Sequence, residues 1–233
     1  MKKHSPLQGW LNRTDPLCSF IKLENRPANH EFGGFLGIDL VVPVHESIGL
    51  APETLENTWQ TVNKYVISAL ELIDSDEPLW LDKEEVQMIK ETLGEPPTFC
   101  YPIYIFSAGD NNNERPVYIG RTSSSTSRFS NGHIVCTKLH HPQYKGMSKR
   151  LYLGTVVLLA DDKEYQPLEW VHPFKKAIET LNSVEAQLIY DLKPELNLHH
   201  KNKTNVTIPI TPIHIQNFTE QTDFLNDYMC FPP

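Results

Sequence analysis

The dipeptide Pro96-Pro97 divides this chain, and the residues that follow it constrain the fold most. β-rich runs cover residues 101–107 and 116–119, with the polar stretch Gly109-Asp110-Asn111-Asn112-Asn113 between them. Two such runs around a turn of this composition predict a β-hairpin. We therefore place the start of a central domain at residue 98.

Three further elements are predicted after the hairpin. The Ser/Thr-rich residues 122–129 carry a helix start signal, so a short helix is expected there. The apolar run 150–160 predicts a strand in the middle of a sheet. Residues 173–192 have a helical pattern that we expect to break near Asn182-Ser183 and to end at Pro194. The order β-β-α-β-α predicts an α+β class, with a small central mixed or antiparallel sheet flanked by helices.

The residues before the hairpin predict a mainly helical and acidic N-terminal extension. Residues 35–43 predict a short buried strand. Apolar residues recur at three- and four-residue steps over 52–73 and, more briefly, over 81–93, which predicts two helices. Asp82 is the expected N-cap of the second helix and Gly94 its expected C-cap. We assign this extension to dimerisation, partner binding or bracing of the central domain.

The last residues predict a short C-terminal extension. A strand is expected over 205–215, at a sheet edge, because Pro209 and Pro212 cannot donate backbone hydrogen bonds. Residues 217–228 predict a final helix. The predicted division of the chain is therefore 1–97, 98–203 and 204–233.

The charge is unevenly distributed along the chain, which carries a net charge of −8. Residues 27–100 hold three basic and fourteen acidic side chains, whereas residues 101–160 hold seven basic and two acidic ones. A polyanionic substrate would be attracted to the second block and repelled by the first. A random fluctuation on a solvated surface explains the same pattern, so charge alone leaves both interpretations open.

The composition also bears on the compartment. No run of 18 apolar residues occurs, so we expect no transmembrane helix. The N-terminal residues are not followed by an apolar region, so we expect no secretory signal. The four cysteines include no Cys-x-x-Cys pair and indicate free thiols in a reducing cytoplasm.

Two tyrosines hold corresponding places in the predicted hairpin. Pro102-Ile103-Tyr104 lies on its first strand and Tyr118-Ile119-Gly120 on its second. Further polar residues follow in the order Arg121, Arg128, His133, Glu185 and Asn197. Taken singly, cross-strand aromatic neighbours and solvated helix faces account for each of them. Their joint order and spacing favour a site.

In that order and spacing, the residues resemble the GIY-YIG endonuclease superfamily over residues 98–200. The resemblance implies that Tyr104 takes or relays the proton of an attacking water and that Tyr118 positions the phosphate or assists this relay. A phenol, with an ordinary pKa near 10, needs a cationic or metal neighbour to act as a base at neutral pH. Arg121 and Arg128 would supply that positive charge, and the planar guanidinium of Arg128 would bind a phosphate oxygen.

This sequence departs from the family pattern in two places. Its first tripeptide is Pro-Ile-Tyr instead of Gly-Ile-Tyr, and Pro102 is tolerated at a strand start or an edge. His133 comes five residues after Arg128, whereas many members have a His or Tyr four residues after it. We retain His133 as a candidate general base or partner of the base.

By the same resemblance, Glu185 is the single metal-binding carboxylate. One carboxylate together with several waters is usual for Mg²⁺, and Mn²⁺ is the alternative ion. The ion would act as a Lewis acid on the phosphate. Asn197 matches the terminal element of the family and would orient backbone or water near the site.

The segment between the predicted helix and the predicted strand 150–160 is basic. Two interpretations remain open for its cations: a solvated loop, or a loop that contacts phosphate beside the site. Tyr144 and Met147 in this segment could insert between bases or stack on them. The cations are Lys138, Lys145, Lys149 and Arg150.

We therefore expect a cytoplasmic, metal-dependent endonuclease that hydrolyses duplex DNA, as a restriction-type, sequence-specific enzyme. A single active site per chain suggests a homodimer that cuts both strands. The alternatives are a structure-specific repair or recombination nuclease and a non-catalytic nucleic-acid-binding or regulatory protein on the same fold.

Overall fold

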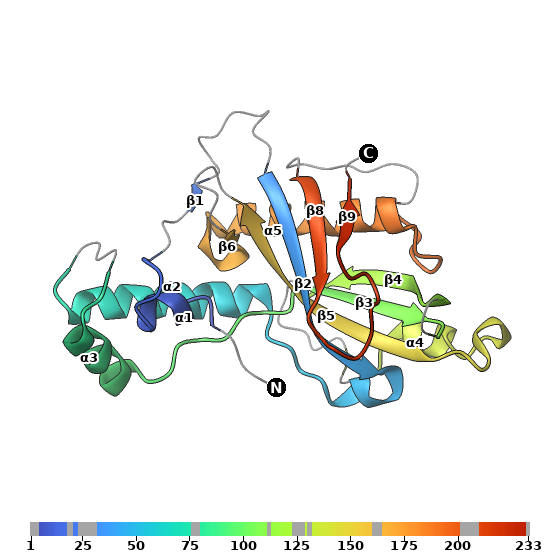
Figure 1. The fold of residues 1–233 in the computed structure, drawn as a ribbon, viewed down its shortest axis with the longest axis horizontal. Coiled ribbons are helices and arrows are strands. Elements are labelled where there is room, and N and C mark those ends of the chain that lie inside the picture. The colour runs from blue at the N-terminus through green and yellow to red at the C-terminus, as the bar shows by residue number, and fades with distance from the viewer. Residues whose placement is uncertain are drawn as a thin grey trace.

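The chain folds into an α+β structure in which helices lie on both faces of one mixed sheet (Figure 1). This is a computed structural model. It describes residues 5–17, 21–22, 32–75, 80–110, 113–122, 129, 132–159, 165–200 and 210–231.

The main sheet has seven strands, six of them in the order β4-β3-β5-β2-β8-β9, while β6 pairs with β5 beside this path. Only the pair β2–β8 is parallel, and the other pairs are antiparallel. The strands are β2 (Phe32–Pro43), β3 (Ile103–Ala108), β4 (Arg115–Arg121), β5 (Lys149–Leu159), β6 (Tyr165–Pro167), β8 (Ile210–Asn217) and β9 (Tyr228–Cys230).

Among the described residues, five α-helices accompany the sheet, and a two-stranded sheet pairs β1 (Ile21–Lys22) with β7 (Val171–His172) in parallel. The helices are α1 (Gln8–Leu11), α2 (Leu55–Leu72), α3 (Lys83–Leu93), α4 (Ile134–Lys138) and α5 (Phe174–Leu192). Short 3₁₀ segments cover Val44–Gly49, Pro142–Tyr144 and Leu168–Trp170.

Capping side chains explain where two helices begin. The Asp82 carboxylate accepts the Glu85 N–H at 2.8 Å, and the Glu85 carboxylate accepts the Asp82 N–H at 2.7 Å, a reciprocal capping box at the start of α3. Thr54 caps α2 in a similar way through the Asn57 N–H. The predicted helices over 52–73 and 81–93 are thus confirmed, and Asp82 and Gly94 are the caps of the second helix, as expected.

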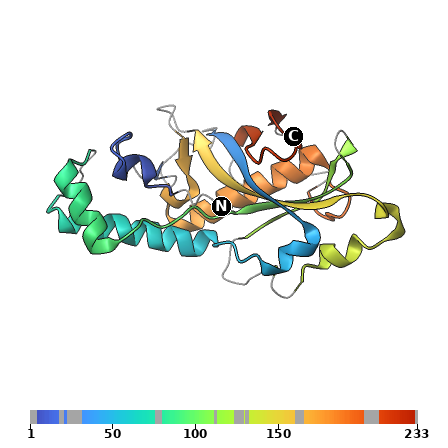
Figure 2. The ribbon, with the colours of Figure 1, turned by 60° about the horizontal axis from the view of Figure 1, so that its bottom comes forward.

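The two faces of the sheet pack against different elements. One face, which includes Ile103, Ile105 and Ile119, forms a core with the apolar side of α5. The opposite face, which includes Tyr104 and Phe106, packs against α4 and the segments around it. Figure 2 shows α5 and α4 on opposite sides of the strands. A third core joins α1, α2 and α3 around Trp170.

The predicted hairpin is confirmed as β3 and β4, and the predicted strand 150–160 is confirmed as β5, an interior strand. Pro102 stands directly before β3, where its missing N–H costs no ladder hydrogen bond, and its carbonyl accepts the Thr122 N–H at 2.9 Å. The helix predicted over 122–129 falls mainly on 123–128, outside the described residues.

The C-terminal prediction was wrong in two respects. Residues 217–228 form no helix, because the Asn217 amide donates to the carbonyls of Thr222 and Phe224 and because Leu225 has a positive φ. The end of this segment enters strand β9 (Tyr228–Cys230) instead. The strand near Pro212 is β8, which lies inside the sheet between β2 and β9; a register shift of β8 against β2 accommodates the proline.

The structure also differs from the predicted break in the helix over 173–192, and it bears on the predicted boundaries of the three segments. Helix α5 continues through Asn182-Ser183 without a break, with Ser183 buried and its hydroxyl donating to the Glu179 carbonyl. The three predicted segments, 1–97, 98–203 and 204–233, contribute β2, β5 and β8 in turn to the same sheet, so they are not separate structural units.

Among the described residues, no helix is both long and apolar enough to cross a membrane.

Glu169 is a carboxylic acid buried where the sheet meets α2, with 1% of its surface exposed. Its carboxyl oxygen accepts the Cys100 N–H at 3.3 Å, and burial raises the pKa of this carboxyl above its ordinary value. The fold therefore prefers the protonated acid. The stabilising contribution of that protonation is present below the ordinary carboxyl pKa and is lost as pH rises through the raised pKa.

We expect Glu169→Gln, which is neutral at every pH, to become more stable relative to the wild type as pH rises from 4 to 8. Urea unfolding at several pH values measures this difference. Glu84→Gln, an exposed acid of α3, is the matched control and should show no such trend. A constant difference between Glu169→Gln and the wild type would contradict the prediction.

Candidate active site

Tyr104 and Tyr118 lie side by side on β3 and β4. Their ring centroids are 6.1 Å apart, with the ring planes inclined by 28°. Both side chains point to the α4 side of the sheet, where Tyr104 is fully buried and Tyr118 is partly exposed. The structure thus brings together the two predicted tyrosines at one end of the hairpin.

His133 contacts both rings from the start of α4. Its Nε2 lies 3.1 Å from the Tyr104 hydroxyl, and its ring centroid lies 5.4 Å from that of Tyr118. The other ring nitrogen, Nδ1, accepts the Val135 N–H at 3.2 Å and so caps α4. Since Nδ1 accepts, the hydrogen of the neutral imidazole is assigned to Nε2, which then donates to the Tyr104 oxygen.

Gly120 makes this arrangement sterically feasible. It is the cross-strand partner of Tyr104, and the phenol ring lies directly over its Cα. A Cβ at position 120 would overlap both the hydroxyl and the ring carbons of Tyr104. The glycine of the Tyr118-Ile119-Gly120 tripeptide is therefore required by a close approach of a side chain, a role that sequence reasoning missed.

Arg121 and Glu185 form an ion pair at the end of β4. The Arg121 Nε donates to a Glu185 carboxylate oxygen at 2.8 Å, and the two side chains are 28% and 20% exposed. Arg121 follows Gly120 directly, but strand alternation turns it toward α5, which carries Glu185. The tyrosines and this ion pair therefore lie on opposite faces of the sheet, so the structure does not gather them into the single cluster that the resemblance implies.

Asn197 secures the outer edge of β4. Its amide accepts the Ile119 N–H at 2.9 Å and donates to the Ile119 carbonyl at 2.8 Å, and the Leu196 N–H bonds the Val117 carbonyl. β4 is the terminal strand of the sheet, so these bonds replace those of a further strand. Asn197 therefore positions backbone between the two residues Tyr118 and Gly120.

A hydrated divalent ion at Glu185 would share the carboxylate with Arg121, which already donates to one of its oxygens. The Glu185 carboxylate is partly accessible, and one carboxylate with waters is a normal ligand set for Mg²⁺. One turn earlier on the same face of α5, the Asn182 amide oxygen is buried and has no hydrogen-bond partner among the described residues. A buried oxygen of this kind is a natural acceptor for an ordered water. Within the described part of the chain, no cluster of three or more His, Cys, Asp or Glu could hold an ion.

The predicted basic residues have different environments. Lys138 and Lys145 are exposed, while Lys149 is partly exposed at the start of β5. Arg150 donates to Glu114 at 2.9 Å, and the Glu114 side chain is only 2% exposed, so part of the Arg150 charge is neutralised. Arg128 lies outside the described residues.

The suggestion that Tyr144 stacks on bases was wrong. Its side chain is fully buried, and its hydroxyl donates to Glu195 at 2.5 Å. Burial, reinforced by this carboxylate, raises the pKa of Tyr144 to about 12. Tyr144 is therefore a structural residue, whereas Met147 in the same segment is only partly buried.

Gly120→Ala tests the packing of Tyr104. Overpacking at this position should lower the free energy of unfolding by about 1–3 kcal/mol and displace the phenol from His133. Chemical denaturation measures the first effect, and the imidazole NMR resonances of His133 report the second. Gly49→Ala is the matched control, because a Cβ there meets no atom within 4 Å. Unchanged His133 resonances in Gly120→Ala would show that the ring does not depend on this glycine.

Comparison of the chain with protein family models, with curated proteins and with solved structures gives no significant match. The comparisons therefore assign neither a family nor an activity. The chemistry of the site has to be inferred from the contacts of its own residues.

Proposed function

We propose that this chain is a metal-dependent endonuclease that hydrolyses DNA phosphodiester bonds with a GIY-YIG active site. The observation that carries the proposal is the hydrogen bond between Tyr104 and His133, next to Tyr118 and over Gly120. The residues of this cluster come from β3, β4 and the start of α4, which follow one another along the chain. They include both tyrosines and the histidine that the resemblance to this superfamily singles out.

The contacts of Tyr104 suit a proton-accepting role. Phosphodiester hydrolysis needs a group that takes the proton of the attacking water. A His133 Nε2–H that donates to the Tyr104 oxygen stabilises that oxygen when it bears negative charge. In the proposed reaction, Tyr104 is in the phenolate form that this hydrogen bond favours, and it becomes the neutral phenol when it accepts the proton of the water. Tyr118, which is partly exposed beside it, orients the phosphate.

The Arg121–Glu185 pair supplies charge on the other side of the strand end. The Arg121 guanidinium is partly exposed, and its charge stabilises the additional negative charge of the phosphorane-like transition state. Glu185 would hold Mg²⁺ or Mn²⁺, with Asn182 accepting a water of the ion's hydration shell. When bound, the ion polarises the phosphate as a Lewis acid and neutralises the leaving oxygen.

Restriction-type cleavage of duplex DNA by a homodimer is the specific form that we propose. Each chain offers one candidate site, so cutting both strands at once requires two copies. The restriction-type assignment rests on analogy, because no separate recognition module is evident from the sequence. Mapping cut positions on a random-sequence duplex library should give a discrete motif. Cuts only at flaps or junctions would indicate a structure-specific repair nuclease instead.

The activity is tested by incubating the purified protein and plasmid DNA with Mg²⁺ or Mn²⁺. We expect cleavage by the wild type, and Glu185→Gln should abolish it while leaving DNA binding intact. Glu179→Gln, on the same helix, is the matched control and should cleave normally. Binding without cleavage of duplex, nicked, branched or single-stranded DNA by the wild type would contradict the enzyme assignment and favour a regulatory protein.

Removing the Tyr104 hydroxyl tests the proton-accepting role. Tyr104→Phe should lower the cleavage rate by about 100- to 10,000-fold, the usual contribution of a general base, with little change in affinity. Tyr65→Phe is the matched control; it loses a hydroxyl that only donates to the Gly94 carbonyl near α3. A Tyr104→Phe rate within a few-fold of the wild type would show that the phenol is not the base.

A further inference from the structure

A cavity of about 550 Å³ lies on the α4 side of the sheet. Its walls come from three stretches of the chain: the end of β2 with the 3₁₀ segment that follows it, helix α4 with the two residues after it, and the four residues around the start of β5. Figure 2 shows the first two of these next to each other on the same side of the sheet. The lining residues are Pro43, Val44, His45, Cys136, Leu139, His140, Met147, Ser148, Lys149 and Arg150.

The lining of the cavity has an apolar part and a basic part. Val44, Leu139 and Met147 provide an apolar surface, while Lys149 and Arg150 provide positive charge, and no lining residue is acidic. Lys149 forms no ion pair with any residue of the described chain, whereas Arg150 is partly neutralised by Glu114. An apolar surface next to the positive charge of Lys149 matches a ligand with one flat apolar part and one anionic part. A nucleotide has this combination.

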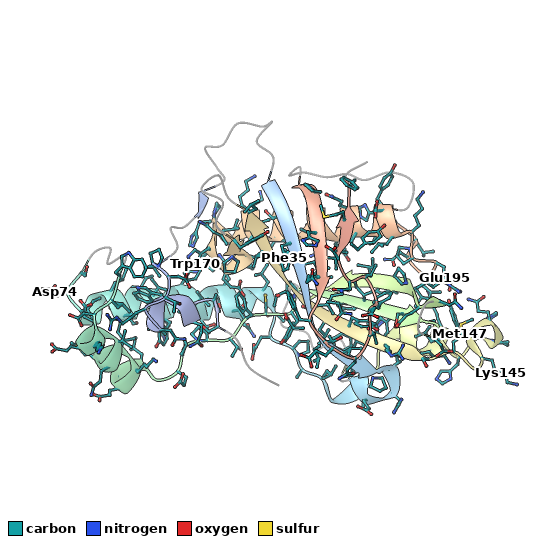
Figure 3. All side chains as sticks on the ribbon, in the orientation of Figure 1. Phe35, Asp74, Lys145, Met147, Trp170 and Glu195 are labelled. Atoms are coloured by element: carbon teal, nitrogen blue, oxygen red, sulfur yellow. The ribbon has the colours of Figure 1, made fainter. Side chains whose placement is uncertain are left out.

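Helix α4 connects the cavity to the candidate active site. Its N-cap His133 contacts Tyr104, and its C-cap Leu139 lines the cavity. The six residue steps from His133 to Leu139 span about 9 Å at the rise of an α-helix, which corresponds to two or three nucleotide steps along a duplex strand. A strand cleaved beside His133 could therefore place a neighbouring nucleotide in the cavity. Figure 3 shows Met147 and Lys145 at the same end of the molecule.

We infer that this cavity is a nucleotide subsite, which holds one base of the substrate strand against Met147 while Lys149 binds the adjoining phosphate. The inference rests on the proposed nuclease function and extends it, because it assigns part of substrate binding to the segment that follows β2. The base packs on the side chains of Val44, Leu139 and Met147. A base outside its stack is the occupant, since a cavity enclosed by protein on several sides does not admit a stacked base pair.

Methyl NMR tests the base contact directly. The chain has four methionines, so ¹³C-methyl labelling gives a simple spectrum. With EDTA present to prevent cleavage, a thymidine tetranucleotide should shift the Met147 methyl resonance through the ring current of the base. A tetranucleotide with abasic sugars should not shift it. Met88, exposed on α3 at the other end of the molecule, should be unaffected by either (Figure 1).

Affinity measurements with the same two oligonucleotides complete the test. Loss of the bases should weaken wild-type binding by roughly threefold to tenfold, as expected for one apolar contact surface, and Met147→Ala should remove this difference. Lys149→Ala should weaken binding of both oligonucleotides and reduce the salt slope by about one phosphate contact. Met88→Ala and Lys83→Ala, both on α3, are the matched controls.

The possible failures are distinguishable. A wild type that cleaves DNA but binds both oligonucleotides equally, with no Met147 shift, overturns the subsite and leaves the nuclease proposal standing. A Met147 shift without any cleavage supports the subsite and overturns the nuclease. Absence of all nucleic-acid binding overturns both.

Discussion

The packing of the Tyr104 ring on the backbone of Gly120 is the contact on which the candidate site depends. Tyr104 belongs to an interior strand and is fully buried, so its ring has room only where the neighbouring strand has no side chain. This placement aims the phenol oxygen at His133 and leaves Tyr118 beside the ring. It also fixes where Arg121 emerges, since Arg121 is the next residue along β4.

The same side chains serve both the local fold and the proposed chemistry. His133 uses one ring nitrogen to cap α4 and the other to contact Tyr104. Asn197 satisfies both backbone groups of Ile119, so the outer edge of β4 is fixed at this residue. Preorganisation of this kind matters for catalysis, because groups already held in place need not be ordered during the reaction.

The sequence predicted correctly the elements whose turn, apolar or capping residues lie within or directly beside the element. The hairpin β3–β4, the apolar strand β5 and the capped helix α3 all carry their own turn, burial or capping residues. Helix α5 continues where a break was predicted, because the buried side chain of Ser183 and the apolar residues around it pack against the sheet. Tertiary packing thus outweighed the weak helix propensity of Asn182-Ser183.

Side-chain contacts that follow no regular spacing could not be predicted from such patterns. Nothing local in residues 217–228 indicated that Asn217 would tie the loop together through its side-chain amide, in place of helical hydrogen bonds. The partners of the candidate site were predicted in part: the family resemblance selected Tyr104, Tyr118 and His133. The pairing of Arg121 with Glu185, 64 residues later, and the place of Gly120 beneath Tyr104 became evident only in three dimensions.

The position of β2 has a consequence for how such a protein can evolve. Because β2 fills the gap between β5 and β8, excising everything before residue 97 would leave two unpaired strand edges inside the sheet. Residues 98–233 alone, fused to another protein, would therefore not keep the sheet that holds the candidate site. The segment that contains β2 and the residues of the candidate site would have to be inherited together.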